Sequence, residues 1–290
     1  MRSIQDKPPG QAWDEAAQGW NEHGALIRQW LGEATIAMLD GAHIGPGDKV
    51  LDVAAGAGDQ TVDLARRVGP GGTVLATDIS ARILELAASN ARAAGLPQVS
   101  TRQADAQALG LADANFDAAI CRLGLMFCTT PLLALREMRS TLVPGGRFGA
   151  LVFSGPQANP CVTILMRTAC LHAGVTPGDP FAPGSLLSLG RPGLIASLLH
   201  EAGFVDIDVR PLAAPMRAAR CEDYVEFVRS SASPVIEVLK SLDPQAREEA
   251  WTDITRQLQQ FATPRGWQGP NELLLCSAAN PRAATNYGQP

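Results

Sequence analysis

Short apolar segments alternate with helix-like segments between residues 49 and 153, and this alternation constrains the fold more than any other feature. The pattern predicts strands over residues 49–54, 73–77, 98–103, 116–121 and 147–153. It predicts helices over residues 59–68, 81–94 and 131–142. Such alternation is typical of βαβ units, whose strands lie parallel and are covered by helices on both faces. Because crossovers between parallel strands are right-handed, most of the strand order follows as well.

The alternation breaks after Phe153, where residues 155–190 are rich in proline and glycine. Later segments resume it, with predicted helices near 160–172, at 191–202 and within 222–262, and predicted strands at 204–210 and 271–277. We therefore expect an α/β fold: a Rossmann-like, doubly wound, mostly parallel sheet of about seven strands. Helical insertions before and after the sixth strand are expected to fold over the strand ends as a lid.

The chain is expected to divide into four segments. An N-terminal helical lid segment (1–44, helical over 13–40) precedes a ligand-binding core at 45–154. Residues 155–280 supply the rest of the core, with strands six and seven, together with the insertions. A tail at 281–290 is expected to be flexible.

Charge and composition exclude several classes of protein. The 290 residues carry a formal net charge of −5 with no long basic run, so a nucleic-acid partner is not expected. The sequence contains no stretch of about 18 apolar residues, so no membrane span is expected. The N-terminus also lacks the apolar region of a secretory signal. Six scattered cysteines without a C-x-x-C pair argue against a metal site and favour a reduced, cytoplasmic protein.

The most informative segment is ValLeuAspValAlaAlaGlyAlaGlyAspGln, at residues 50–60. A loop of small residues directly after the first strand lets a ligand approach the backbone where the next helix begins. Asp78 ends the second strand about twenty residues later, the spacing expected for a carboxylate that binds ribose. These features predict a nucleotide-like ligand at the carboxyl ends of the strands.

A dinucleotide site fits these residues poorly. A Gly-x-Gly-x-x-Gly motif that starts at Gly56 would need glycine where Thr61 stands, and a start at position 54 meets Ala54 and Asp59. Asp52 lies within the strand, where dinucleotide sites usually stay apolar. An acid there suits a ligand with an ammonium or sulfonium group.

Five ordered motifs resemble those of class I S-adenosylmethionine (SAM)-dependent methyltransferases, over roughly residues 45–153. The group of ubiquinone/menaquinone-biosynthesis C-methyltransferases and their small-molecule relatives is the most similar in character. The motifs are Asp52–Gly58, Thr77–Ser80, Ala104–Ala106, Phe116–Ala118 and Leu142–Gly146. Trp13-Asp14 with Trp20-Asn21 also resembles the first helix of that group, which packs near the cofactor. Ala54 is one departure, since many members have glycine there.

The resemblance implies a role for each matching residue. Gly56 and Gly58, with the backbone at Ala54, would line the methionine part of SAM. Asp52 would order this loop or bind the ammonium group. Asp78 would accept hydrogen bonds from the ribose hydroxyls. The remaining implied cofactor contacts are Ile79 on the adenine, Asp105 and the backbone of Ala106 at the adenine amino group, Trp20, and Arg122.

Structural roles are the alternatives for several of these residues. The glycines could serve only a tight turn, and Asp78 could cap the following helix. Asp105 could be a solvated loop residue. Arg122 is equally compatible with a structural ion pair and with a contact to cofactor or substrate.

The acceptor side of the site is weakly marked, because methyl transfer depends mainly on proximity and orientation. His23 and His172 are the candidate general bases, since one follows the Trp20 segment and the other lies in the insertion after strand five. We predict transfer of a methyl group to carbon, oxygen or nitrogen of a small organic acceptor. Other chemistry on the same fold (hydrolysis, decarboxylation or cyclisation) and non-catalytic SAM binding are the alternatives. A homodimer is one possible assembly; the sequence leaves the oligomeric state open.

Overall fold

A seven-stranded sheet forms the centre of the molecule in the computed structural model, which describes residues 10–231 and 233–282 apart from five side chains (Ala12, Glu15, Ala16, Trp20 and Ser233). The strand order is β3-β2-β1-β4-β5-β10-β6, and β10 alone runs antiparallel to its neighbours. The strands are β1 (Lys49–Val53), β2 (Thr73–Asp78), β3 (Val99–Gln103), β4 (Phe116–Arg122), β5 (Leu142–Phe153), β6 (Val205–Ala213) and β10 (Glu272–Ala279). The predicted Rossmann-like, mostly parallel sheet is confirmed.

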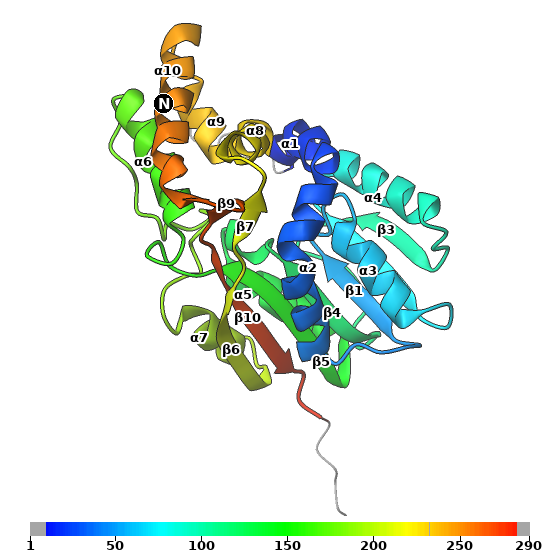
Figure 1. Cartoon of the computed structure of the whole chain (residues 1–290). Coiled ribbons are helices and arrows are strands. Elements are labelled where there is room, and N and C mark those ends of the chain that lie inside the picture. Colours follow the sequence, from blue (N-terminus) through cyan, green and yellow to red (C-terminus); the bar gives the residue numbers. More distant parts are fainter. Residues whose placement is uncertain (1–9, 232, 283–290) are drawn as a thin grey trace, which may run out of the picture.

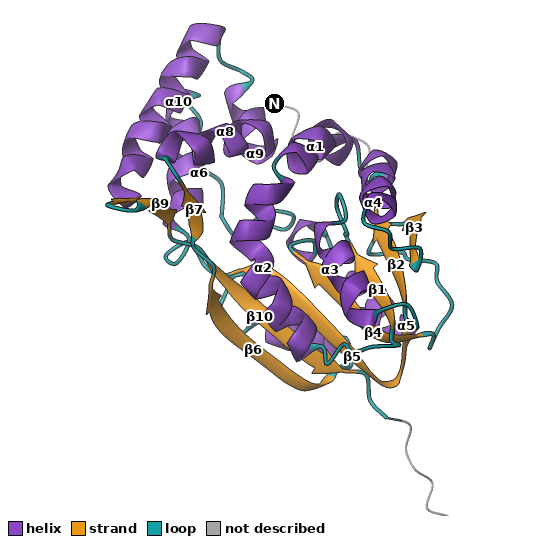
Figure 2. Ribbon diagram, turned by 45° about the vertical axis from the view of Figure 1, so that its right-hand side comes forward, coloured by secondary structure: helices purple, strands orange, loops and turns teal. Residues whose placement is uncertain are grey.

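Helices cover both faces of this sheet (Figures 1 and 2). On one face lie α2 (Gly24–Gly41), α3 (Asp59–Val68) and α4 (Ala81–Ala93), and on the other lie α5 (Pro131–Thr141) and α7 (Leu194–Glu201). Leu51, Ile120 and Phe148 are fully buried between the layers. Removal of such apolar side chains from water stabilises the fold by roughly 1.5–3 kcal/mol each.

The helical region predicted over 13–40 consists of two helices in the structure. Helix α1 (Gln11–Glu22) ends at His23, and α2 then starts in a new direction. Ile27, Leu31 and Met38 of α2 are buried against the sheet. Within the predicted lid segment 1–44, therefore, α1 lies beside the insertions, whereas α2 covers the sheet (Figure 1).

The insertions gather beyond one edge of the sheet (Figure 1). The predicted helix near 160–172 is α6 (Pro160–His172), and the helical region 222–262 is broken into α8 (Cys221–Ser231), α9 (Ser233–Leu239) and α10 (Pro244–Leu258). A small antiparallel sheet, β7 (Met216–Ala218), β9 (Gly266–Gly269) and β8 (Ala262–Thr263), was not predicted. Strands of two to four residues are too short for a hydrophobic alternation to reveal them.

The C-terminal end of the described chain follows β10. Pro281 and Arg282 lie beyond it, and the rest of the predicted tail, residues 283–290, lies outside the described residues. No helix in the described part of the chain is long and apolar enough to cross a membrane.

Candidate functional site

The loop Ala54–Gly58 connects β1 to α3 at the carboxyl edge of the sheet, and backbone geometry explains its small residues. Gly58 has a φ of 85°, and a Cβ there would lie 2.9 Å from the Cα of Ala87, so α4 packs directly behind the loop. A Cβ on Gly56, whose φ is 58°, would have nothing within 4 Å. The loop therefore has a closed back and an open front, as a ligand cradle requires.

Asp52 anchors this loop from within β1. It is completely buried and accepts hydrogen bonds from Thr61 Oγ1 at 2.6 Å and Gln60 Nε2 at 3.2 Å. Burial raises the pKa of Asp52 to about 6, against the lowering effect of these two bonds. Because both partners lie in the first turn of α3, Asp52 fixes the helix onto the strand. Asp52 has two implied roles, ordering the loop and binding the ammonium group, and these contacts fit the first.

Asp78 lies beside the same loop, at the end of β2. One carboxylate oxygen accepts the Gly56 N–H at 3.0 Å, and the other accepts the Ser80 N–H at 3.0 Å. Burial raises the pKa of Asp78 from its usual value, although these backbone bonds oppose the shift. The N-cap of α4 is Ser80, whose hydroxyl accepts the Ile83 N–H at 3.0 Å. Helix capping thus falls to Ser80, and the Asp78 carboxylate stays beside the loop.

The segment after β3 joins the same edge. The Ala104 N–H donates to the Asp78 carbonyl at 2.9 Å, which places Asp105 and Ala106 next to the end of β2. Asp105 accepts the Gln107 N–H at 2.8 Å, and the Gln107 side-chain oxygen accepts the Thr130 N–H at 2.8 Å. Gln107 thus ties the loop after β3 to the loop after β4.

Arg122 ends β4 and is almost buried. Its guanidinium pairs with Asp59 at 2.9 Å and donates to Thr35 Oγ1 at 2.9 Å, and Asp59 pairs also with Arg28 at 3.1 Å. These contacts are those of the structural ion pair, one of the two roles left open for Arg122. Asp59 is the first residue of α3, and the sequence contained no signal for its pairing with residues 28 and 122.

Ala54 contacts the chain just beyond Arg122. A Cβ on Gly124 would lie less than 3.0 Å from the Ala54 Cβ, so a larger residue there would force one of the two to shift. Ala54 itself has a φ of 56°. It therefore holds a left-handed backbone that most residues avoid.

His23 and His172 lie in different parts of the molecule. His23 Nδ1 lies 2.8 Å from the Gly19 carbonyl, and its ring packs edge-on to Phe227 with centroids 5.3 Å apart. Since a carbonyl only accepts, Nδ1 carries the proton and Nε2 of the neutral ring keeps a lone pair. His172 on α6 instead pairs with Asp253 of α10 at 3.1 Å. The side chain of Trp20 lies outside what the structure describes.

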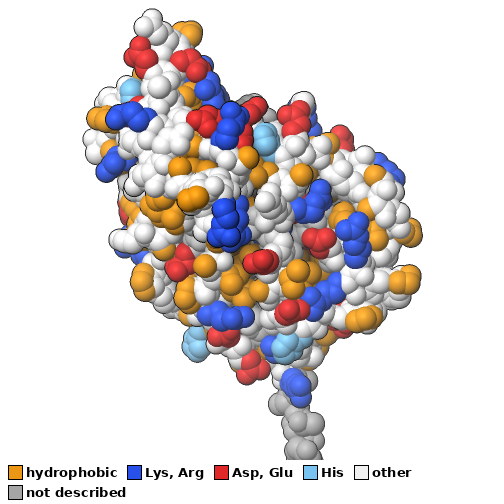
Figure 3. Space-filling view, in the orientation of Figure 1, with side chains coloured by type: hydrophobic (Ala, Val, Ile, Leu, Met, Phe, Trp, Pro, Cys, Tyr) orange, Lys and Arg blue, Asp and Glu red, His pale blue; other side chains and the backbone are white. Residues whose placement is uncertain are grey.

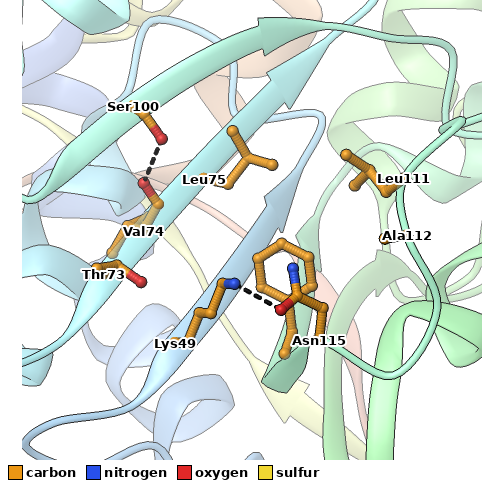
Figure 4. Close-up of a pocket in the computed structure, with 9 residues that line it drawn as sticks. Lys49, Thr73, Val74, Leu75, Ser100, Leu111, Ala112 and Asn115 are labelled. Atoms are coloured by element: carbon orange, nitrogen blue, oxygen red, sulfur yellow. Dashed lines mark hydrogen bonds between the residues drawn. The ribbon is translucent and has the colours of Figure 1, made fainter.

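A separate cavity of about 180 Å³ lies at the amino ends of β1, β2 and β4 (Figure 4). Lys49 lines this cavity, where its ammonium donates to Asn115 at 2.7 Å and lies 5.2 Å from the centre of the Phe116 ring. Asp52, Asp78 and Asp105 lie at or just beyond the opposite ends of the strands. This cavity is therefore not part of the candidate site. Among the described residues, no group of three or more His, Cys, Asp or Glu side chains is placed to hold a metal ion.

Comparisons with known proteins agree with this geometry. A family model described as "Methyltransferase domain" matches residues 50–146. The ubiquinone/menaquinone biosynthesis C-methyltransferase of Escherichia fergusonii is 31% identical over 185 residues, which cover 61% of this chain and 74% of that protein. Other proteins of the same name are 39–42% identical over shorter stretches, and the chain spans about half of their length (46–53%).

Solved structures share the fold at low identity. A phosphoethanolamine N-methyltransferase from Haemonchus contortus, in complex with phosphomonomethylethanolamine and S-adenosylhomocysteine (SAH), matches with a TM-score of 0.59 and 14% identity, over 95% of this chain and 61% of that one. The [4+2]-cyclase SpnF matches with a TM-score of 0.57 and 18% identity, over 95% and 99% of the two chains. With the matching family model and a relative covered over about three quarters of its length, the chain belongs to the class I SAM-dependent methyltransferases.

Proposed function

We propose that this chain transfers a methyl group from SAM to a small organic acceptor. The observation that carries the proposal is the position of Asp52, Asp78 and Asp105 at the carboxyl ends of three neighbouring strands, where Asp78 bonds to the open-fronted loop Ala54–Gly58. When bound, SAM supplies the electrophilic methyl group, so the protein contributes mainly orientation and exclusion of water.

The residues present suit this cofactor. Asp78 uses its oxygens for two backbone N–H groups, yet a carboxylate offers about four lone-pair positions and can accept two ribose hydroxyls as well. The space in front of Gly56 leaves room for the methionine part, beside the backbone of Ala54. Ile79, Asp105 and Ala106 would hold the adenine, and Asp52 would keep the loop in shape. Asp59 and Thr35 take two of the five N–H donors of Arg122, so a direct contact with the cofactor would use one of the remaining donors.

We place catalysis chiefly in proximity and orientation. His23 is the better supported of the two candidate bases, because its Nε2 carries no hydrogen-bond partner among the described residues and α1 also reaches the cofactor loops. His172 is engaged by Asp253, whose pKa this contact lowers. The second ring nitrogen of His172 stays available as well, so the contact of α1 with the loop after β2 is what favours His23.

The relatives favour methyl transfer over the other chemistries of this fold. The curated relatives are C-methyltransferases, whereas the likeness to SpnF concerns the fold alone. We infer no nucleic-acid partner, because the net charge is −5 and charges of both signs are interspersed on the face in Figure 3. A homodimer and a cytoplasmic location remain predictions; the six free, buried cysteines favour a reducing compartment.

Calorimetry and product analysis test the proposal. We expect SAM and SAH to bind at one site per chain, and a folded chain that binds neither would refute it. A screen of phenols, quinones and small acids with mass spectrometry should then detect an acceptor heavier by one methyl group. Cofactor binding with an unmethylated but rearranged product would favour the cyclase-like alternative instead.

A further inference from the structure

Helix α1 contacts the cofactor loops on one side and the lid on the other. Toward the core, Asp14 accepts a hydrogen bond from Ser80 after β2, and Trp13 packs edge-on to Phe127 after β4, with centroids 4.8 Å apart. Toward the lid, a Cβ on Gly19 would lie 2.5 Å from the Ser230 carbonyl of α8. Helix α1 therefore links the segments after β2 and β4 to α8.

A third core contact of α1 reaches the loop between β1 and α3 through one amide. The Asn90 side chain, on α4, donates to the Ala57 carbonyl at 2.9 Å and to the Asn21 side-chain oxygen at 3.1 Å. Because a backbone carbonyl only accepts, the Asn90 NH₂ group must face Ala57, and its second hydrogen is then available to Asn21. The orientation of both amides follows from this one contact.

Asn90 also helps to hold one peptide unit of the loop Ala54–Gly58, the unit between Ala57 and Gly58. The Gly58 N–H donates to the Ala55 carbonyl at 3.1 Å, and the Ala57 carbonyl on the same peptide is the group that Asn90 holds. Ala87, one turn earlier on α4, is the residue that Gly58 packs against. Two consecutive turns of α4 therefore set the loop, and Asn90 on the second of them also bonds to Asn21 of α1.

We propose that Asn90 is a positioning residue that couples docking of α1 to the cofactor-binding conformation of the loop Ala54–Gly58. The proposal rests on the function proposed above. Coupling of this kind is reciprocal: if a docked α1 stabilises the loop, a cofactor that stabilises the loop also promotes docking of α1. Helix α1 packs against α8 at Gly19 and His23. Occupancy of the cofactor site therefore also promotes assembly of the lid.

The test uses the full-length chain with SAH as the probe. Calorimetry gives the affinity for SAH, and hydrogen–deuterium exchange of residues 10–22 with and without SAH reports docking of α1. In the wild type, SAH should slow exchange across α1. Asn90→Ala should weaken SAH binding about threefold to tenfold, the range expected for loss of one or two hydrogen bonds, and should abolish most of the slowing.

Two further Asn90 variants separate donor chemistry from size. Asn90→Asp has the same shape but no donor for the Ala57 carbonyl, so it should resemble Asn90→Ala. Asn90→Gln keeps the donor and should restore part of the slowing. Gln18→Ala is the matched control on α1, because Glu22 of the same helix is the one side chain among the described residues to which Gln18 bonds; this variant should bind SAH as the wild type does.

The outcomes distinguish this proposal from the proposed function. Asn90 is exposed, so its variants should remain folded and unfold in one cooperative urea transition. Binding of SAH within twofold of the wild type, with unchanged slowing of exchange in α1, would overturn the positioning role while leaving the methyltransferase proposal intact. A folded wild-type chain that binds neither SAM nor SAH would overturn both.

Discussion

The close approach of Gly124 to Ala54 permits a test of the cofactor loop that needs no ligand. Gly124 has a φ of −107°, which alanine adopts freely, so only the added methyl group makes Gly124→Ala unfavourable. That methyl would lie less than 3.0 Å from the Ala54 Cβ and 2.9 Å from Cys121 Sγ, where 3.5–4.0 Å is normal between carbons. Overpacking of this kind costs about 1–3 kcal/mol. We expect Gly124→Ala to destabilise the chain by about that amount.

Ala54→Gly should remove the contact of the new methyl group with the Ala54 Cβ and leave its contact with Cys121 Sγ. It also relieves the left-handed backbone at Ala54, a gain of about 1–2 kcal/mol that is offset by roughly 0.4–1 kcal/mol of added unfolded-chain entropy. The single variant should therefore be close to neutral or slightly stabilising. In the double variant, the Cys121 contact remains, so about 1–2 kcal/mol of the Gly124→Ala penalty should be recovered, a coupling within the range measured for residues in contact.

Urea unfolding of the four proteins gives the coupling energy directly. Gly32→Ala on α2 is the matched control, because a Cβ there meets nothing within 4 Å and should stabilise the helix by about 0.5–1 kcal/mol. Additive effects of the two substitutions, within about 0.5 kcal/mol, would show that residues 54 and 124 do not touch in solution, and the reasoning would be wrong.

Three other substitutions test the site itself. Asp78→Ala should weaken SAM binding by about 1–3 kcal/mol in calorimetry while the fold survives; unchanged affinity would exclude the ribose role. Asp52 has a folded pKa of about 6, above its ordinary value of 3.8, so its contribution to stability is present below pH 4 and lost as the pH rises through 6. Asp52→Asn has no carboxyl group to ionise, so it should not lose stability in this way. Its free energy of unfolding relative to that of the wild type should therefore rise by about 3 kcal/mol between pH 4 and 7. Parallel pH profiles of the two proteins would contradict the raised pKa of Asp52. His23→Ala should slow turnover less than about tenfold, as catalysis by proximity requires. A loss of roughly 10²–10⁴-fold, together with loss of a pH dependence near neutrality, would show instead that His23 is a base.

The lid prediction concerns α1 and the insertions together. Removal of residues 1–24 should reduce turnover far more than stability, because α2 and the sheet keep their apolar contacts. Thermal unfolding and activity of the same preparation provide the comparison. Full activity in the truncated chain would refute a closing lid.

The sheet could be predicted from the sequence because each buried strand is a short apolar run between turn residues. The shared position of the candidate site residues could be predicted because parallel strands bring their carboxyl ends to one edge, so residues near 52, 78 and 105 lie at that edge without further information. The break at His23 could not be predicted, since both sides of it favour a helix. The strands β7, β8 and β9 are stabilised by their pairing with one another. Segments of two to four residues are too short to show a sequence pattern that predicts such pairing.

The supporting residues of the site escaped prediction for a related reason. Asp59 meets Arg122 across 63 positions, and Asn90 meets Ala57 across 33. Each is an ordinary polar residue at the surface of a helix until the fold supplies its partner. Sequence motifs mark the groups that would touch a ligand, whereas the groups that hold those in place depend on tertiary contacts.

The position of β10 has a consequence for the order in which the chain can fold. In the main sheet, β6 hydrogen-bonds only to β10, which comes about sixty residues later and inserts between β6 and β5. Asn159 receives the incoming strand by bonding both the N–H and the carbonyl of Glu272. Until residues 272–279 leave the ribosome, β5 therefore exposes an unpaired edge and β6 has no place in the sheet. Nascent chains should be most exposed to aggregation and to chaperones during that interval.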